Sequence, residues 1–358
     1  MFIALLAFCL LGLAAGILLL RSVPVCPVNE PGVSRSISVI VPARNEEKNL
    51  PQLLASIPAT QEAATEVIVV DDGSTDSTAE VVAGGNATIL CSSVLPAGWT
   101  GKNWACAQGA EVARGDPLLF LDADTRFTSE GLSHLLSAWE EHSDKTIALS
   151  VLPYHVTKAP YEQLSLFFNL LMAFGAGGFG AFGKPRLFGQ CLLISRDLYD
   201  VCGGHSAVRG RILENLAMAD RIDAVGGKCV CLGGRGTIHV RMFPEGFAQL
   251  CESWTKAFAD GAAASDSVVL VLAIVWLTAL CTVFLLLFSS FWPWRAYAAI
   301  LYIVAAFQVL WFARQVGKFN FISALLYPIP LLFFFCLFGR ALSNRILRRR
   351  VAWRGRRI

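Results

Sequence analysis

The sequence predicts an α/β domain placed between membrane segments, and three observations carry this prediction. Hydrophobic residues make up 55% of the 358 residues, while charged residues make up only 16%; ordinary soluble domains carry about 25% charged residues. Long uncharged stretches lie near both ends of the chain. The middle alternates short apolar runs with amphipathic stretches, as strands alternating with helices do. This pattern excludes a disordered chain and argues against an entirely soluble enzyme.

Residues 1–21 are expected to form an N-terminal transmembrane anchor. The first 20 residues carry no charge, and at 1.5 Å per residue a helix of this length spans about 30 Å, the thickness of a bilayer core. A cleaved signal peptide would have a basic region before its apolar run, which is missing here. Arg21, Arg35, Arg44 and Lys48 follow the run, so the domain after it is expected to face the cytoplasm.

Residues 267–342 contain the C-terminal membrane segments, with apolar runs at 268–291, 296–313 and 319–339. Three full spans would place the Arg-rich tail, residues 343–358, outside the cell, against the positive-inside rule. Pro328 and Pro330 interrupt the third run, where a helix would kink or turn back. We therefore expect a re-entrant third segment and a cytoplasmic tail that binds anionic lipid. The arginines from position 340 onward are Arg340, Arg345, Arg348, Arg349, Arg350, Arg354, Arg356 and Arg357.

Residues 22–266 are predicted to form one cytoplasmic domain with a sheet covered on both faces. The apolar runs are continuous rather than alternating, which favours buried parallel strands separated by helices. The net charge of +3 gives no case for nucleic-acid binding. Within this domain, residues 161–182 are apolar enough to be a span, but we expect an interfacial segment. The expected strands are 38–41, 66–70, 88–90 and 117–121, and the expected helices are 46–57, 77–83 and 102–113.

Polar clusters follow three of the expected strands, at 42–46, 71–76 and 122–124. In open α/β sheets, ligands bind at the carboxyl ends of the strands. Asp122 and Asp124 flank one alanine, and two carboxylates so placed can converge on Mg²⁺ or Mn²⁺; a solvated turn is the alternative. Lys102 lies near an expected helix start and supplies a cation suited to a diphosphate. Together these features predict a site for a nucleoside diphosphate and a metal.

The sequences VPARNEE at 41–47, VDDGSTD at 70–76 and DAD at 122–124 resemble the nucleotide-sugar half of family 2 glycosyltransferases. GKNWAC at 101–106, PYHVTK at 153–158 and RMFPEGF at 241–247 resemble a membrane branch of that family that acts on carotenoid acids. Hopanoid-associated members are similar in the first half. The resemblance implies a GT-A fold, a Rossmann-like mixed sheet with helices on both faces. It also implies a UDP-sugar donor, UDP-glucose by analogy, and a divalent metal.

The resemblance also implies roles for individual residues. Asp71 and Asp72 would hold the uracil or ribose, and Asp122 and Asp124 would hold the diphosphate through Mg²⁺ or Mn²⁺. Lys102 would face the diphosphate. The residues expected to line the base pocket are Ala43, Asn45 and Glu46.

Family 2 enzymes commonly carry an acidic pair that includes the base for the acceptor. Here Glu214 is followed by Asn215, so the need for a base is itself in question. A hydroxyl acceptor benefits from a base, whereas a carboxylic acid is already ionised near neutral pH. Glu214 is therefore either the base or an exposed helix acid. For His205 there are two alternatives. Its side chain lies near the metal or the acceptor, or it is a structural histidine.

Trp254 is also expected among the residues that bind the donor. It lies where processive family members carry a Q-x-x-R-W motif, which is absent here. The sequence thus favours a single transfer over polymer extension. The expected activity is sugar transfer from UDP-glucose to a lipophilic acceptor in the bacterial plasma membrane. The favoured acceptor is the carboxylate of a C30 apocarotenoid. A hopanoid, a polyprenyl phosphate or diacylglycerol are alternative acceptors. A polysaccharide synthase and a catalytically silent scaffold are weaker alternatives.

Overall fold

A computed structural model describes the protein as two compact units, a sheet unit and a helical unit. The sheet unit comprises residues 24–154 and 185–241, and the helical unit comprises 1–23, 155–184 and 242–358. The expected domain of residues 22–266 thus contributes to both units. The described residues are 2–28, 36–57, 65–142, 146–211, 213–261, 266–289, 292–346, 352–353 and 356–357.

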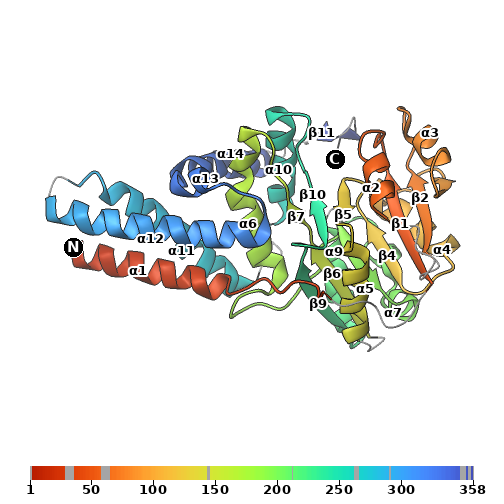
Figure 1. Ribbon diagram of the computed structural model, residues 1–358, viewed down its shortest axis with the longest axis horizontal. Helices are drawn as coiled ribbons and strands as arrows, with labels where there is room; N and C mark the ends of the chain where they lie inside the picture. Colours follow the sequence, from red (N-terminus) through yellow and green to blue (C-terminus); the bar gives the residue numbers. More distant parts are fainter. Residues whose placement is uncertain are drawn as a thin grey trace. The chain divides into compact units, whose positions relative to one another are not determined.

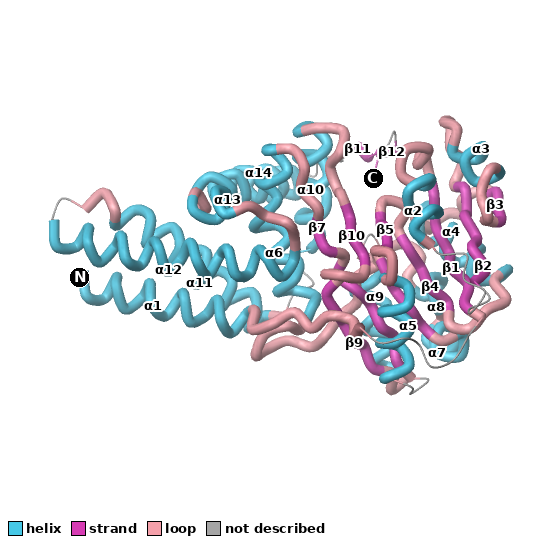
Figure 2. The backbone as a smooth tube through the Cα atoms, in the orientation of Figure 1, coloured by secondary structure: helices cyan, strands magenta, loops and turns pink. Residues whose placement is uncertain are grey.

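The sheet unit is built on a seven-stranded sheet with the order β3-β2-β1-β4-β8-β6-β9 (Figure 1). Neighbouring strands are parallel, except that β8 runs antiparallel to both β4 and β6. Figure 2 shows these strands in magenta. Their bounds are β1 Ile37–Ala43, β2 Thr65–Asp71, β3 Thr88–Cys91, β4 Leu118–Leu121, β6 Ile147–Leu152, β8 Cys191–Ile194 and β9 Lys228–Gly233.

All four strands expected from the apolar runs are present, but the sheet is mixed, as the GT-A resemblance implies, and not parallel throughout. Strand β8 has the sequence CLLI and is buried at every position. A strand covered on both faces is apolar whichever way it runs, so its composition carries no signal of its direction. The direction is visible only in its pairing with β4 and β6.

Helices cover both faces of this sheet. On one face, α2 and α5 pack against side chains such as Val41 and Leu119; on the other, α4 and α9 pack against Ile40 and Phe120. The expected helix 46–57 begins only at Leu50, with Pro51 in its first turn, where proline is tolerated. The helices are α2 Leu50–Ser56, α3 Thr78–Ala83, α4 Gly101–Val112, α5 Gly131–Glu141, α7 Arg196–Cys202, α8 Gly204–Ala207 and α9 Glu214–Ala224.

A second, three-stranded sheet has the order β5-β10-β7, with β5 Thr125–Phe127, β10 Ile238–Val240 and β7 Tyr154–His155. Strands β5 and β10 are antiparallel, and Arg126 pairs with His239. Because β5 begins directly after Asp124, this small sheet continues the carboxyl end of β4.

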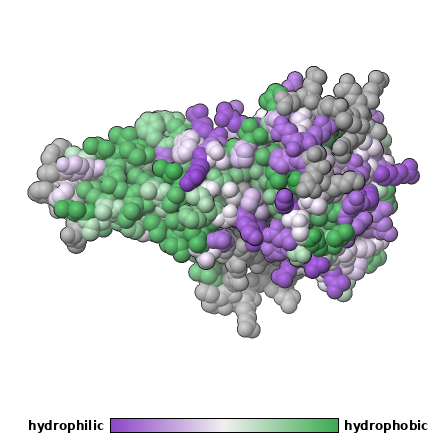
Figure 3. Space-filling view, turned by 90° about the horizontal axis from the view of Figure 1, so that it is seen from below, coloured by the Kyte–Doolittle hydropathy of each residue, from purple (hydrophilic) through white to green (hydrophobic). Residues whose placement is uncertain are grey.

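The helical unit contains two helices, within the described residues, that are long and apolar enough to cross a membrane: Ser267–Leu286 and Trp294–Val316. Hydrophobic side chains gather on the surface of this unit, seen as green in Figure 3. Examples are Leu11 on α1, Ile274 on α11 and Phe307 on α12, all about half exposed or more. The elements are α1 Phe2–Leu19, η1 Pro160–Ser165, α6 Leu166–Gly177, α10 Phe247–Gly261, α11 Ser267–Leu286, α12 Trp292–Val316, α13 Phe321–Leu325, α14 Pro328–Ile346, β11 Ala352–Trp353 and β12 Arg356–Arg357.

The N-terminal helix α1 packs closely on α11. A Cβ placed on Gly12 would lie 2.1 Å from the Ala279 Cβ, and one on Gly16 would lie 2.7 Å from the Trp276 ring. Small residues spaced by four positions let helices in membranes approach this closely. The anchor expected at residues 1–21 is therefore a helix whose two glycines lie against α11.

Two expected segments take definite forms in the helical unit. The apolar stretch at 161–182 forms η1 and the 12-residue helix α6, about 18 Å long at 1.5 Å per residue, which is too short for a span. Its Phe167, Phe168 and Phe174 are fully or almost fully buried. The third C-terminal segment is broken between α13 and α14, and Pro328 starts α14. Half of the Arg-rich tail, residues 347–351, 354–355 and 358, lies outside the described residues.

Candidate active site

The turns that follow β1 and β2 hold each other in place. The Asn45 N–H donates to Ser74 Oγ (3.0 Å), and the Thr75 N–H donates to Asn45 Oδ1 (2.8 Å). Asp71 Oδ1 accepts from the Ser74 N–H at 2.9 Å. Asn45 has φ 55°, in the left-handed region, which asparagine tolerates better than most residues. We call these residues, with Asp72, the β1–β2 cluster.

Asp72 is fixed at its backbone. Its N–H donates to the Ala43 carbonyl (2.8 Å), and the Asp72 carbonyl accepts from Arg44 Nη1 (3.1 Å). Arg44 Nη1 also lies 3.6 Å from Asp72 Oδ2. Glu46 is buried and accepts from Asn49 Nδ2 at 2.8 Å. Ala43, Asp71 and Asp72 thus lie together at the strand ends, while Glu46 belongs to the frame behind them.

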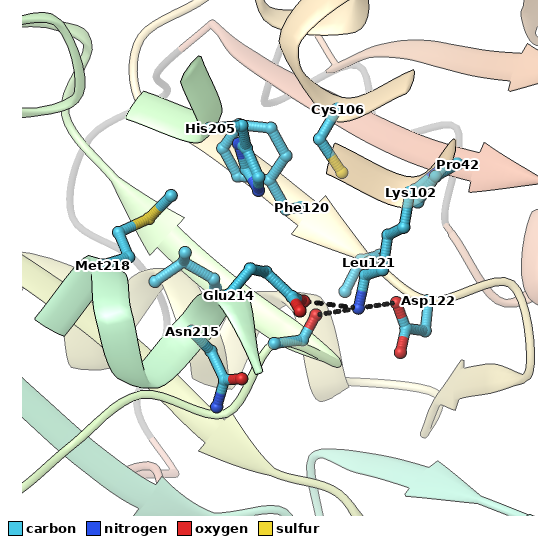
Figure 4. Close-up of a pocket in the computed structure, with 12 residues that line it drawn as sticks. Pro42, Lys102, Cys106, Phe120, Leu121, Asp122, His205, Glu214, Asn215 and Met218 are labelled. Carbon is cyan, nitrogen blue, oxygen red and sulfur yellow. Dashed lines mark hydrogen bonds and ion pairs between the residues drawn. The ribbon is translucent and has the colours of Figure 1, made fainter. Parts of the chain in front are cut away.

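Four separate segments meet at the Lys102 ammonium (Figure 4). Lys102 Nζ lies 2.8 Å from Asp122 Oδ1 and 3.0 Å from Glu214 Oε1. It also donates to the Gly189 carbonyl at 3.3 Å. Lys102 comes from the first turn of α4, whose N-cap Thr100 accepts from the Asn103 N–H. We call Lys102, Asp122, Gly189 and Glu214 the Lys102 cluster.

The positively charged form of Lys102 is stabilised by its partners. Burial by itself would lower the pKa of the ammonium, but the carboxylates of Asp122 and Glu214 raise it well above the usual value. Glu214 is buried as the first residue of α9, where a negative charge is favoured by the helix dipole. The cluster therefore holds one fixed cation between two acids.

A cavity surrounds this cluster and continues toward β1. Its polar wall includes Lys102, Asp122, Glu214 and Asn215, and Pro42 connects it to the β1–β2 cluster. The apolar part of the wall consists of Cys106, Phe120, Leu121, Leu192 and Met218. The lining of this small cavity thus combines apolar side chains with a few polar groups that converge on Lys102.

His205 lies in the wall of the cavity. Its Nδ1 lies 2.9 Å from the Tyr199 hydroxyl, and its ring lies 4.7 Å from the Phe120 ring, centroid to centroid. Burial and the nearby Lys102 lower the pKa of His205 to about 3. The imidazole is therefore neutral near pH 7, and the pairing with Tyr199 fixes its orientation.

The oxygen donors after β4 suit a hard divalent cation. Asp122 uses Oδ1 for Lys102, whereas Oδ2 carries no hydrogen bond or ion pair to any described residue. Asp124 lies two positions further, at the start of β5. The described residues include no group of three or more His, Cys, Asp or Glu side chains that could hold a metal. Two carboxylates with phosphate and water as further ligands match the preference of Mg²⁺.

The structure brings Lys102, Asp122, Glu214 and His205 together around one cavity. Trp254 belongs to the helical unit, where it is 1% exposed and stacks on Phe168, with ring centroids 4.7 Å apart.

Two residues of the site carried no sequence signal. Gly189 lies between Lys102 and Glu214, and a Cβ there would be 2.8 Å from Glu214 Oε1. Asn103 is fully buried, and its Nδ2 lies 3.0–3.1 Å from the carbonyls of Val208, Arg209 and Arg211. Asn103 thus fixes the loop that leads to Glu214. Only its place beside Lys102 could have indicated it.

Comparison with known proteins identifies the family. The model for glycosyl transferase family 2 matches residues 38–207. A 4,4'-diaponeurosporenoate glycosyltransferase from Staphylococcus aureus is 31% identical over 332 residues, covering 90% of this chain and 88% of that protein. The chain belongs to glycosyl transferase family 2. It is a glycosyltransferase, as the resemblance of its motifs implied.

A second relative and one solved structure agree with this family assignment. The enzyme of the same name from Staphylococcus haemolyticus is 33% identical over 258 residues, covering 70% of this chain and 68% of that protein. The mannosyltransferase PcManGT from Pyrobaculum calidifontis, in complex with GDP-Man and Mn²⁺, has 17% identity and a TM-score of 0.57. It covers 97% of this chain, and 96% of that structure is matched. This likeness confirms the GT-A-like mixed α/β fold.

Proposed function

We propose that this family 2 enzyme is an inverting, membrane-bound glucosyltransferase that moves glucose from UDP-glucose to a carboxylate on a long apolar acceptor. The preferred acceptor is a C30 apocarotenoid acid, and the product is a glycosyl ester. Two relatives named 4,4'-diaponeurosporenoate glycosyltransferase support the acceptor. Mg²⁺ or Mn²⁺ would be held by Asp122 and Asp124, with the free Asp122 oxygen as one ligand, and would neutralise charge on the leaving diphosphate.

The observation that carries the proposal is the ion pair between Lys102 and Glu214. Glu214 is already engaged in this pair, because its Oε1 lies 3.0 Å from the Lys102 ammonium. The neighbouring side chain is Asn215, whose Nδ2 donates to the Leu187 carbonyl. Of these two neighbouring side chains, Glu214 is held in an ion pair and Asn215 is not a base. This arrangement suits an acceptor that is already ionised when it binds.

The transfer then needs no proton movement. One oxygen of the acceptor carboxylate attacks C1 of the sugar and forms the ester bond. The bond from C1 to the diphosphate oxygen breaks, and its electron pair leaves with UDP. Lys102 places a positive charge where that negative charge develops. The β1–β2 cluster supports the nucleoside, with Asp71 and Asp72 toward the uracil or ribose and Ala43, Asn45 and Glu46 framing the base pocket.

The location proposed for the enzyme is the bacterial plasma membrane, with the sheet unit in the cytoplasm. The two long apolar helices support this, together with the hydrophobic surface of the helical unit. A C30 acid dissolves in lipid, so an enzyme at the membrane surface meets its acceptor there. The basic tail would add attraction to anionic lipid.

The test is transfer from UDP-[14C]glucose by detergent-solubilised full-length protein with Mn²⁺. A C30 apocarotenoid acid and the corresponding alcohol are offered in parallel. Label is expected in the acid alone; Glu214→Gln is expected to retain transfer within about threefold, and Asp124→Asn to lose it. Faster labelling of the alcohol, together with loss of activity in Glu214→Gln, would show that Glu214 is a base for a hydroxyl acceptor.

A further inference from the structure

The three-stranded sheet of the sheet unit has one apolar and one charged face. Side chains along a strand alternate between faces. Thr125 and Phe127 of β5 and Ile238 and Val240 of β10 are buried. Arg126 and His239, which lie between them in each strand, are only half-buried and are paired directly across the ladder. The two therefore project from the same face, opposite the core.

The same face extends along both strands toward the catalytic carboxylates. Asp124 and Arg241 each lie next to the end of a strand, two positions from Arg126 and His239, and both charges are near enough to Arg126 to affect its pKa. Tyr154 of β7 joins on the other side of β10, where its ring lies 5.9 Å from that of His239. We call Arg126, His239, Arg241 and Tyr154 the basic face.

The basic face carries more positive than negative charge. The Arg126 side chain makes no hydrogen bond or ion pair to the described residues. Burial and the nearby charge of Arg241 lower the pKa of Arg126, and Asp124 acts in the opposite direction. Two arginines thus share the field of one carboxylate.

We propose that the basic face binds the carboxylate of the acceptor, with Arg126 and Arg241 as the specificity-determining residues. This inference rests on the proposed function and deepens it. Arginine presents a planar fork of N–H donors that matches a carboxylate. The diphosphate of the donor already has Lys102 and the two aspartates. Arg126 lies two positions from Asp124, so an anion held on the basic face would lie next to the proposed metal position.

The first experiment separates acceptor from donor binding. Transfer to the C30 acid is measured with Arg126→Gln, Arg241→Gln and the charge-conserving Arg126→Lys, with Arg235→Gln, an exposed arginine of the β9–β10 turn, as the matched control. Each glutamine variant is expected to raise the KM for the acid about tenfold, the value of one charge-assisted hydrogen bond. The KM for UDP-glucose should stay within twofold. A rise only in the KM for UDP-glucose would place the arginines at the diphosphate, and no change in either KM would overturn the proposal.

The second experiment does not depend on transfer, so it keeps this inference distinct from the proposed function. The carboxyl resonance of 1-¹³C-decanoate is followed by NMR as detergent-solubilised protein is added, with 1-¹³C-decanol as the neutral probe. Wild type and Arg235→Gln are expected to shift the decanoate resonance, and both basic-face glutamine variants to lose the shift. As a control for folding, each variant should bind UDP with Mn²⁺ and keep the melting temperature of the wild type. An equal shift of the decanoate resonance in all variants would overturn the inference, even if the C30 acid is a substrate. A shift that occurs with decanoate but not with decanol, and that the basic-face variants lose, would support the inference even if the C30 acid is not a substrate.

Discussion

The β1–β2 cluster and the Lys102 cluster lie at the same edge of the sheet but are assembled differently. The first is built from two turns about 30 positions apart, which hold each other through Asn45, Ser74 and Thr75. The second collects Lys102, Asp122, Gly189 and Glu214 from across more than a hundred positions. The first is a rigid local frame, whereas the second depends on the packing of α4, β4 and α9. Substitutions of Lys102 and Asp122 in the second should therefore have the larger effects on catalysis.

The largest effect is expected for Asp122→Asn. This change removes both the partner of Lys102 and one proposed metal ligand, so transfer from UDP-[14C]glucose should fall about a thousandfold, equivalent to several kcal/mol. Asp200→Asn changes an exposed carboxylate on α7 and should leave the rate within twofold. Chelation of divalent metal with EDTA should match the Asp122→Asn loss and be reversed by Mn²⁺. An Asp122→Asn enzyme with near-normal rate would show that the cluster does not hold the leaving group.

Lys102→Met should have the next largest effect. It leaves Asp122 and Glu214 facing each other without a cation and removes the positive charge proposed to face the diphosphate. We expect kcat/KM for UDP-glucose to fall about a hundredfold. Lys228→Met, at an exposed position on β9, is the matched control. If Lys102→Met loses stability but keeps its kcat/KM, the ion pairs serve the fold alone.

A smaller effect is expected in the β1–β2 cluster, from Asp72→Asn. The backbone contacts with Ala43 and Arg44 remain, so the turn should keep its shape while one acceptor for the nucleoside is weakened. The KM for UDP-glucose should rise about tenfold with kcat unchanged. Glu80→Gln, exposed on α3, supplies the control. A fall in kcat with an unchanged KM would contradict the difference drawn between the two clusters.

The smallest effect concerns His205 and stability rather than catalysis. Its pKa in the folded protein is about 3, below the ordinary value of 6.5, so the unfolded chain takes up a proton that the folded chain does not. Stability should therefore be lost as pH falls below about 6.5, by at most about 1.4 kcal/mol per pH unit.

Melting temperatures at pH 7 and pH 5.5 check this in detergent. His205→Phe should show a pH-induced decrease smaller by about 2–4 °C than that of wild type. The absolute melting temperature of the variant also reflects the lost pairing with Tyr199, so the comparison is made between the two pH values. An equal decrease in both proteins would mean that His205 is as easily protonated in the folded state as in the unfolded state.

The sequence predicted the local elements of the sheet unit well. The strands at β1, β2, β3 and β4 and the polar turns after them follow from contiguous apolar runs and turn residues, which act over a few positions. The direction of β8 was not predictable, because a strand of four buried apolar residues has the same composition whether it runs parallel or antiparallel to its neighbours. The donor-binding role expected for Trp254 stays a prediction; within the helical unit its ring stacks on that of Phe168.

By itself, the sequence determined the α/β organisation between apolar helical segments, the family and the acidic motifs at the strand ends, because each depends on residues that are neighbours in the chain. Only the tertiary structure decided which of those groups meet. The pairing of Lys102 with Glu214, the close approach of Gly189 and the alignment of Arg126 with His239 join positions far apart in the chain. Strand pairing and helix packing set such contacts, and no short stretch of sequence encodes them.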